Sequence, residues 1–379
     1  MKFLCRALCV LLIVNCAYSA PVTEESMGDF EPMDDDLVLY IPKFAVKLGF
    51  RGLTGAKSSF GGTGEMTSNT FIGDPEDDVQ RVYHDGYVGF DQRTVLDPAG
   101  NNVPVTDDDR TNNWGFRSQT QATPDGLIAM HAYSVTTTDP SFVENDPDAT
   151  FGVELSLERE VGNVFGTRLK WGVVGGFSIN QISSELNSEL GVNLKTTTDF
   201  YSLGGQAAPT APFSGPTPGI VDNTPLLGTK VLLRTEEFTA TAAAVQSYWK
   251  LRGAYITLRL GPTLFVPISE KLSATFSAGG VLVYSGTTFD VAQSFTPQTG
   301  DTIVGRMNSA DTALLPGYYV DASLQYAMTD TAGLYLGAVY QSSGDYTQDV
   351  TSGNELSKYS TRVDLSALQG IRAVVSFKF

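Results

Sequence analysis

Along the last nine residues of the chain, apolar side chains occupy every second position, and Arg372 and Lys378 stand between them. A two-residue period is typical of a β-strand, because successive side chains of a strand point to opposite faces of the sheet. One face of this strand would be wholly apolar and the other polar. The apolar positions are Ile371, Ala373, Val375, Phe377 and Phe379.

The same alternation recurs along much of the chain. Each alternating segment is close to the roughly ten residues that a tilted strand needs to cross a bilayer. After the N-terminal leader, no apolar run approaches the about 20 residues of a membrane-spanning helix. A chain of this kind can cross a membrane only as a closed barrel, because open sheet edges cannot face lipid. The upstream segments are 44–50, 154–158, 169–179, 256–264, 272–284, 320–326 and 334–340.

The alternation that ends on Phe379 resembles the C-terminal assembly signal of bacterial outer-membrane β-barrel proteins. The resemblance implies an all-β fold: a transmembrane, antiparallel, up-and-down β-barrel with short periplasmic turns and long outer loops. It also implies outer-membrane lipid and the barrel-assembly machinery as partners, and the bacterial outer membrane as the location. Counting alternating segments back to residue 81 gives ten strands. The segment 44–50 adds one more, and because both ends should lie in the periplasm, parity predicts about twelve strands, with ten possible.

Connection lengths agree with this topology. Short turns are expected near Asp125, Asn163, Ser269 and Thr329, and long loops at 92–111, 139–149, 185–249, 286–316 and 346–367. Outer-membrane barrels place their short turns on the periplasmic side and their long loops outside. The run from Asn113 to Phe116, which holds Trp114, is expected at the membrane interface as part of an aromatic belt.

The N-terminus has the layout of an export signal. Lys2 and Arg6 precede an apolar stretch, and residues 17–19 fit the small-x-small pattern of a cleavage site, with Ala20 as the first mature residue. A lipoprotein interpretation rests on Cys16 alone and is less favoured, because Asn15 is a poor neighbour for a lipidated cysteine. The expected organisation is a signal peptide at 1–19, an acidic lead-in at 20–37, and a barrel at 38–379.

Composition removes several classes of function. The chain carries 42 Asp and Glu against 25 Lys and Arg, a formal net charge of −17, which argues against a nucleic-acid binder. All 3 cysteines lie in the leader, so the mature chain has no thiol for a disulfide or a nucleophile. Only 2 histidines are present, His84 and His131, and neither His84 with Asp85 nor any local motif forms a recognisable catalytic set. We therefore expect no enzyme and no cofactor.

The polar face of the alternating segments carries both signs of charge. In the hairpin that turns near Asn163, Glu158 is expected to lie opposite Arg168 or Lys170. Two readings remain open: a packed polar core that stiffens the barrel, or the lining of a narrow channel that selects small solutes by charge. The candidate lumen residues are Lys47, Glu154, Glu158, Arg168, Lys170, Arg259, Arg372 and Lys378.

Acidic clusters mark two of the long loops. One comprises Asp74, Glu76, Asp77 and Asp78, and the other spans residues 107–109. Such clusters can bind divalent cations, although neither has the spacing of an EF-hand, and solvated surface charge is the more economical interpretation.

Taken together, the sequence predicts an outer-membrane barrel that is structural or a passive narrow channel. Two alternatives stay open: a surface-exposed barrel that binds or adheres through its loops, and a soluble, secreted β-sandwich that serves as a binding module.

Overall fold

The computed structural model describes residues 44–379, except 106–107, 139–140, 147–148, 166, 217–223, 299 and 354. The expected signal peptide at 1–19, the lead-in at 20–37 and the first residues of the expected barrel lie outside this range. Across the described residues, the structure contains no helix that is both long and apolar enough to span a membrane.

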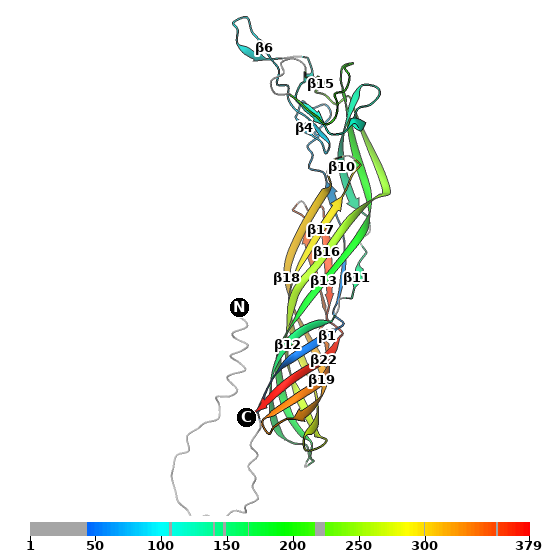
Figure 1. Cartoon of the computed structure of the whole chain (residues 1–379). Helices are drawn as coiled ribbons and strands as arrows, with labels where there is room; N and C mark the ends of the chain where they lie inside the picture. Colours follow the sequence, from blue (N-terminus) through cyan, green and yellow to red (C-terminus); the bar gives the residue numbers. More distant parts are fainter. Residues whose placement is uncertain are drawn as a thin grey trace, which may run out of the picture. The chain divides into compact units, whose positions relative to one another are not determined.

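Eight antiparallel strands close into a ring (Figure 1). Around the ring the order is β12, β1, β22, β19, β18, β17, β16 and β13, and the pairing of β12 with β13 closes it. The first and last strands are neighbours, and the backbone N–H of Phe44 donates to the carbonyl oxygen of Phe379 at 3.3 Å. The ring strands are β1 (Phe44–Thr54), β12 (Thr150–Asn163), β13 (Lys170–Ser202), β16 (Leu233–Pro267), β17 (Leu272–Phe295), β18 (Ile303–Ala327), β19 (Ala332–Ser342) and β22 (Leu368–Lys378).

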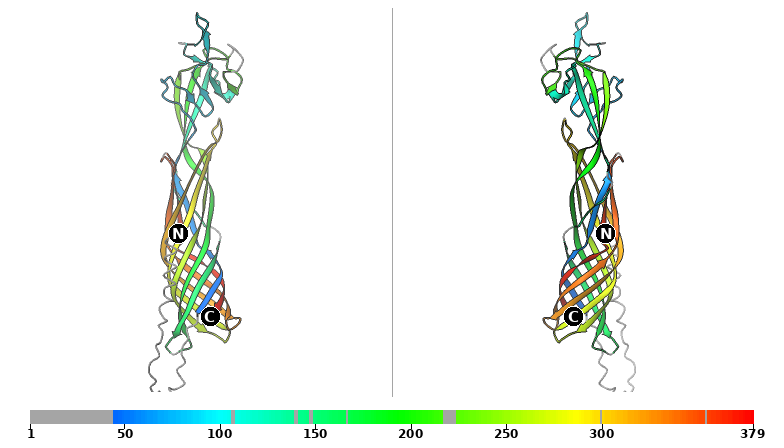
Figure 2. Two further views of the ribbon diagram at one scale, coloured as in Figure 1. Left: turned by 90° about the vertical axis from the view of Figure 1, so that its left-hand side faces the viewer. Right: turned by 90° about the vertical axis from the view of Figure 1, so that its right-hand side faces the viewer.

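A second sheet continues the wall of the ring. It has the order β11, β2, β21, β20, and its members follow β1 and β19 or precede β12 and β22 in the chain. The four longest strands, β13, β16, β17 and β18, run on beside this sheet, as both views in Figure 2 show. We call this part the collar. Its own strands are β2 (Lys57–Thr63), β11 (Val143–Asn145), β20 (Asp345–Thr351) and β21 (Lys358–Asp364).

Beyond the collar, the described residues of the segments 68–132 and 200–232 build a third part, which we call the head. The strand β10 pairs with β13, and β3 pairs with the other edge of β10. Small sheets cover the ends of these strands. The bounds are β3 (Glu65–Thr67), β4 (Arg81–Val82), β5 (Gly86–Val88), β6 (Thr94–Leu96), β7 (Asn102–Pro104), β8 (Arg110–Thr111), β9 (Trp114–Phe116), a 3-10 turn (Gln119–Gln121), β10 (Leu127–Thr137), β14 (Phe213–Ser214) and β15 (Leu227–Gly228).

The long strands reverse their polarity partway along. On β13, the outward positions are apolar or glycine up to Ile179 and mostly polar from Gln181. The inward positions are mostly polar or glycine up to Asn180, with Val174 as the exception, and mostly apolar from Ile182, with Ser184 and Ser188 as exceptions. On β16 the same change occurs near Ile256. Because a surface exposed to lipid must be apolar and a surface exposed to water is mostly polar, the two parts of one strand suit two different solvents.

The reversal occurs at the same level on neighbouring strands. The register pairs Ile179 with Ile256, Ile256 with Tyr284, and Tyr284 with Leu314, so the last apolar outward residues form one hydrogen-bonded row. The apolar outer band below this row includes Leu48, Phe50, Val153, Leu155, Leu258, Leu260, Phe276, Leu324, Leu336, Ile371, Val375 and Phe377. Within the collar, a continuous apolar core takes the place of the polar interior; it includes Phe60, Trp249, Leu251, Phe289, Val291 and Val363.

The ring corrects three expectations. It has eight strands rather than about twelve or ten, although the even number and the shared end of both termini agree with the parity argument. Most of 185–249, 286–316 and 346–367 is strand rather than loop, because the alternation continues there with its polarity reversed. The turn near Asp125 belongs to the head. The closed ring also excludes the β-sandwich alternative, which needs two separate sheets.

An arginine placed in the apolar band tests the boundary between the lipid-facing and the water-facing parts of the wall. Leu258→Arg should lower the free energy of unfolding by about 2–4 kcal/mol, because it brings a charge to the lipid-facing surface. Gln246→Arg changes the same outward face of β16 in the collar and should have little effect. Denaturant titrations in lipid vesicles measure both, and equal costs for the two variants would contradict the boundary.

Candidate functional site: a closed lumen and a folded head

Four charged side chains meet across the interior of the ring. Arg259 donates from Nη2 to Oε1 of Glu154 at 2.5 Å and from Nη1 to Oδ2 of Asp321 at 3.1 Å. Arg372 donates from Nη1 to the same Glu154 oxygen and from Nη2 to Oδ1 of Asp321, both at 2.9 Å. The four residues are at most 6% exposed. Each charge therefore has two partners of opposite sign, which is what burial of a charge requires.

These four residues come from every second strand of the ring. Glu154 lies on β12, Arg372 on β22, Asp321 on β18 and Arg259 on β16, so the sign alternates around the lumen. The strands between them leave room: a Cβ added to Gly176 on β13 would lie 2.6 Å from Nε of Arg259. We call this arrangement the charged layer.

Further buried contacts fill the lumen on either side of the charged layer. Lys47 donates from Nζ to Oε2 of Glu158 at 2.6 Å and lies 3.9 Å from the centre of the Tyr335 ring. Nearer to the collar, Arg51 donates from Nη1 to Oγ of Ser178 at 2.8 Å. Eight-stranded barrels have interiors that side chains can fill, and here buried, partnered charges fill this one.

The structure brings together five of the eight candidate lumen residues: Lys47, Glu154, Glu158, Arg259 and Arg372. Arg168 is exposed in the turn between β12 and β13. Lys170 bonds to Glu160 at 2.7 Å near that turn, and Lys378 is half-buried at the chain end.

The expected pairing of Glu158 with Arg168 or Lys170 is wrong. The register of β12 with β13 sets Glu158 opposite Val174, and its carboxylate bonds to Lys47 on the other neighbouring strand. Strand alternation could not show this, because it fixes the face of a residue but not which strand lies beside it. Asp321 was not among the candidates, although its place between the apolar Val320 and Ala322 is the same signal that marked Arg259.

The head has a core of its own. Trp114 is fully buried, and its ring lies 5.7 Å from that of Phe116 and 4.7 Å from that of Phe213, measured between ring centres. Ile128 and Tyr201 also belong to this core. Trp114 is thus a core residue of the head and not part of a membrane-interface belt. A core of this kind makes the head a folded unit rather than a set of solvated loops.

A buried carboxylate joins the head to the strands that carry it. Asp199 on β13 accepts two hydrogen bonds from Arg234 on β16, at 2.6 and 2.7 Å, and one from the Tyr83 hydroxyl at 2.5 Å. The Tyr83 hydroxyl lies 2.6 Å from that of Tyr201. Burial strongly raises the pKa of Tyr83 and raises the pKa of Tyr201 to about 12.

The two histidines lie near each other in the head. The buried Asp85 accepts from the backbone N–H of His131 at 2.8 Å, and its other oxygen lies 2.5 Å from Nδ1 of that histidine. His84 instead contacts the carbonyl oxygen of Asp301 at 2.6 Å. The pairing of Asp85 with His131 was missed, because it joins residues far apart in the sequence.

The acidic loops are organised around arginines. The buried Arg81 donates to the carbonyl oxygens of Asp74 and Asp77 at 2.7 and 2.5 Å, and Arg93 bonds to Asp108 at 2.6 Å. Among the described residues, no group of three or more His, Cys, Asp or Glu side chains could hold a metal ion. Binding of a divalent cation at these loops stays a prediction.

Comparisons with known proteins give this chain neither a family nor an activity. The sequence matches no protein-family model. A search of curated proteins finds no match either. Matching solved structures include the attachment invasion locus protein Ail of Yersinia pestis, in complex with the heparin analogue sucrose octasulfate, at 10% identity over 87% of this chain and 98% of that one, with a TM-score of 0.22.

Two further solved structures match at similarly low identity. The outer-membrane protease OmpT of Escherichia coli is 9% identical over 89% of this chain and 97% of that one, with a TM-score of 0.26. A Pseudomonas aeruginosa FadL homologue is 11% identical over 89% and 90%, with a TM-score of 0.17. At such scores no activity can be carried over. The closed antiparallel ring with its apolar outer band gives this chain the architecture of an outer-membrane β-barrel protein, as the C-terminal alternation indicated.

Removing one carboxylate from the charged layer should be costly. Glu154→Gln leaves Arg259 and Arg372 with Asp321 as their shared partner, and breaking a buried ion-pair network typically costs about 3–5 kcal/mol. Glu189→Gln, on the outer surface of the collar, should change stability by no more than about 0.5 kcal/mol. Denaturant titrations compare the two, and a small cost for Glu154→Gln would show that the charged layer does not stabilise the ring.

Alkaline pH should loosen the head. Because the pKa of Tyr201 is raised from 10.0 to about 12 by folding, the unfolded chain releases this proton first as the pH rises. The free energy of unfolding should therefore be unaffected at neutral pH. It should fall between pH 10 and 12, by about 1.4 kcal/mol per pH unit for this group. Tyr201→Phe should reduce that slope and Tyr87→Phe should not, as followed by near-ultraviolet circular dichroism in denaturant. Identical slopes in both variants would contradict the assignment.

Proposed function

We propose that this protein is an outer-membrane anchor that displays a binding head at the cell surface, and that it does not conduct solutes. In this proposal the chain is exported by its leader and inserted by the barrel-assembly machinery. The apolar band lies in the membrane, the collar stands in water outside it, and the head makes contact with a partner. No chemical reaction is assigned to the head.

The charged layer is the observation that carries the proposal. A solute channel needs a lumen that stays open, with charges that face water and the passing solute. Here Glu154, Asp321, Arg259 and Arg372 neutralise one another across the lumen at 2.5–3.1 Å. Opening a path would separate buried ion pairs and leave charges without partners, at a cost of several kcal/mol. The interior is therefore better suited to stiffening an anchor than to transport.

The collar supports the display role. From Ile179 to Ser202, β13 continues for about 75 Å of extended strand beyond the apolar band. Its inward side chains, such as Leu190 and Val192, belong to an apolar core that holds the collar together in water. A barrel that served only to seal or strengthen a membrane would not need a water-adapted extension with its own core.

The head offers a surface for a partner on the hairpin of β6 and β7. Val95 is 51% and Leu96 70% exposed, and Phe90 nearby is 51% exposed. The hairpin base is held by Arg93, which bonds to Asp91 at 2.9 Å and to Asp108 at 2.6 Å. Exposed apolar side chains on a braced hairpin are typical of a protein interaction surface.

Conductance separates the display role from the channel role. The refolded wild-type chain should give no discrete current steps in a planar bilayer, because the charged layer closes the lumen. Shortening its members, in Arg259→Ala combined with Asp321→Ala, removes half of the charged layer while its net charge stays at zero, and should permit small steps. Regular current steps from the wild-type protein would overturn the sealed-anchor proposal.

Binding by the head needs a separate test. Cells that display the chain should adhere to surfaces coated with soluble proteins or glycans, and Val95→Ser combined with Leu96→Ser should reduce adhesion by about tenfold or more. Leu324→Ser in the lipid band should leave adhesion per displayed molecule unchanged. Equal adhesion by the wild-type and hairpin variants would remove this hairpin from the proposal.

A further inference from the structure

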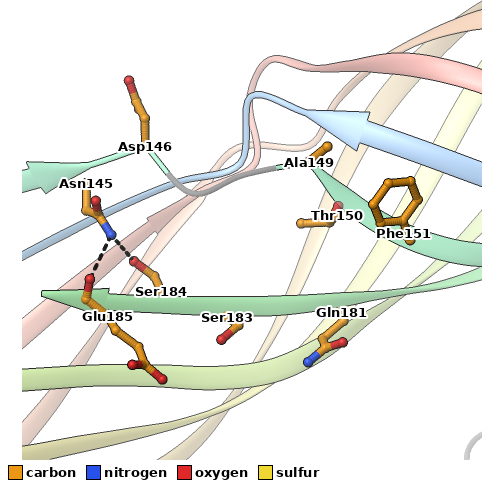
Figure 3. A pocket seen from close by; sticks show the side chains of 9 residues that line it. All are labelled: Asn145, Asp146, Ala149, Thr150, Phe151, Gln181, Ser183, Ser184 and Glu185. Atoms are coloured by element: carbon orange, nitrogen blue, oxygen red, sulfur yellow. Dashed lines mark hydrogen bonds between the residues drawn. The ribbon is translucent and has the colours of Figure 1, made fainter.

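A cavity of about 480 Å³ opens in the outer wall where the barrel meets the collar (Figure 3). Phe151, Gln181 and Ser183 surround it, and Thr150 and Ser184, both buried, are also part of its lining. Figure 3 shows these side chains on two strands, β12 and β13, that separate at this point. The volume is in the range of small-molecule sites.

The cavity exists because the sheet is interrupted. The pairing of β12 with β13 ends at Gly152 and Asn180. Farther along, Asn145 at the end of β11 bridges the gap with its side chain, which donates to Oγ of Ser184 at 2.8 Å and to the carbonyl oxygen of Glu185 at 3.2 Å. Between these two points the edge of β13 faces the cavity, and its polar groups are available to a ligand.

The height of the cavity matches the polarity boundary of the barrel. Immediately below it, Ile179 on β13 and Phe151 and Val153 on β12 are the last outward residues of the apolar band. Immediately above it, the outward residues of β13 are Gln181 and Ser183. A ligand that fits both surfaces must be amphiphilic, with an apolar part on the band and a polar part in the cavity.

The polar part of such a ligand is best matched by a sugar. The lining presents hydroxyl and amide groups, and its two carboxylates already have cationic partners: Lys57 lies 3.5 Å from Asp146, and Lys250 pairs with Glu185. Each carboxylate among the described lining residues is therefore paired with a cation. Phe151, which is 77% exposed, offers an aromatic face beside these donors and acceptors, and sugars stack their C–H faces on such rings while their hydroxyls bond to amides and hydroxyls.

We propose that this cavity binds the saccharide headgroup of a glycolipid of the surrounding membrane leaflet. The lipid tails lie along Phe151, Val153 and Ile179, and sugar hydroxyls exchange hydrogen bonds with Gln181 and Ser183. The ligand would cover the gap in the sheet and join barrel to collar at the membrane surface. The inference uses the membrane placement of the apolar band but is independent of what the head binds.

Filling the cavity tests the proposal without removing any native contact of the barrel interior. In Ser183→Trp, an outward residue of β13 occupies the cavity. Asn187→Trp is the matched control, because Asn187 is exposed on the same face of the same strand outside the cavity. The three proteins are placed in vesicles of phosphatidylethanolamine and phosphatidylglycerol, with or without rough lipopolysaccharide. Bound glycolipid is then measured by native mass spectrometry after extraction.

Wild type and Asn187→Trp should retain lipopolysaccharide, and Ser183→Trp should retain about tenfold less, a difference of about 1.4 kcal/mol. Equal retention by all three would overturn the site. A lipid-free oligosaccharide released from the same lipopolysaccharide should compete weakly, because it lacks tails for the apolar band. If it binds wild type as tightly as the intact glycolipid does, the membrane source is wrong and the cavity serves soluble glycans. Failure of head adhesion leaves this test unaffected.

Discussion

Buried charges that must find partners set the architecture of this barrel. Glu154, Arg372, Asp321 and Arg259 stand on alternate strands, and each needs the two neighbours of opposite sign that only a closed ring of this size provides. A wider ring would pull the pairs apart, and a shift of one residue in register would turn each charge toward lipid. The charged layer therefore depends on strand number and register, and it closes the lumen. Because a closed lumen does not suit transport, the proposed function is binding by the head.

The second organising feature is the reversal of polarity along single strands. Below the row from Ile179 to Leu314, the wall is apolar outside and polar inside; above it, the wall is polar outside and apolar inside. The hydrogen-bonded backbone does not change, because a strand serves either solvent as long as its faces are assigned correctly. The same strands can therefore anchor the chain in lipid and carry a head in water, and the boundary between the two is where the wall cavity lies.

Sequence reasoning recovered the barrel, its antiparallel topology, the shared end of the termini and the inward position of five charged residues, since alternation reports faces directly. It overcounted the strands because alternating segments between 81 and 137, which lie outside the ring, were counted as ring strands. It also placed residues such as Glu185 and Gln246 in a long loop, because the lipid-facing pattern stops at the boundary while the strand itself continues. Partners across the lumen, such as Arg259 with Glu154, depend on ring size and stagger, which no local pattern contains. The head core around Trp114 and the pairing of Asp85 with His131 join distant segments. The local pattern therefore placed Trp114 in a membrane-interface belt and gave no partner for His131.

Accessibility of single cysteines along the outward face of β16 tests the polarity boundary most directly. Cysteine is placed in turn at Leu260, Leu258, Ile256, Arg252, Lys250 and Gln246, and intact cells are treated with a membrane-impermeant maleimide. The account predicts protection at the first three positions and full labelling at the last three, with the step between Ile256 and Arg252. Uniform labelling along the whole strand would contradict a membrane-embedded band, and uniform protection would contradict a collar that stands in water.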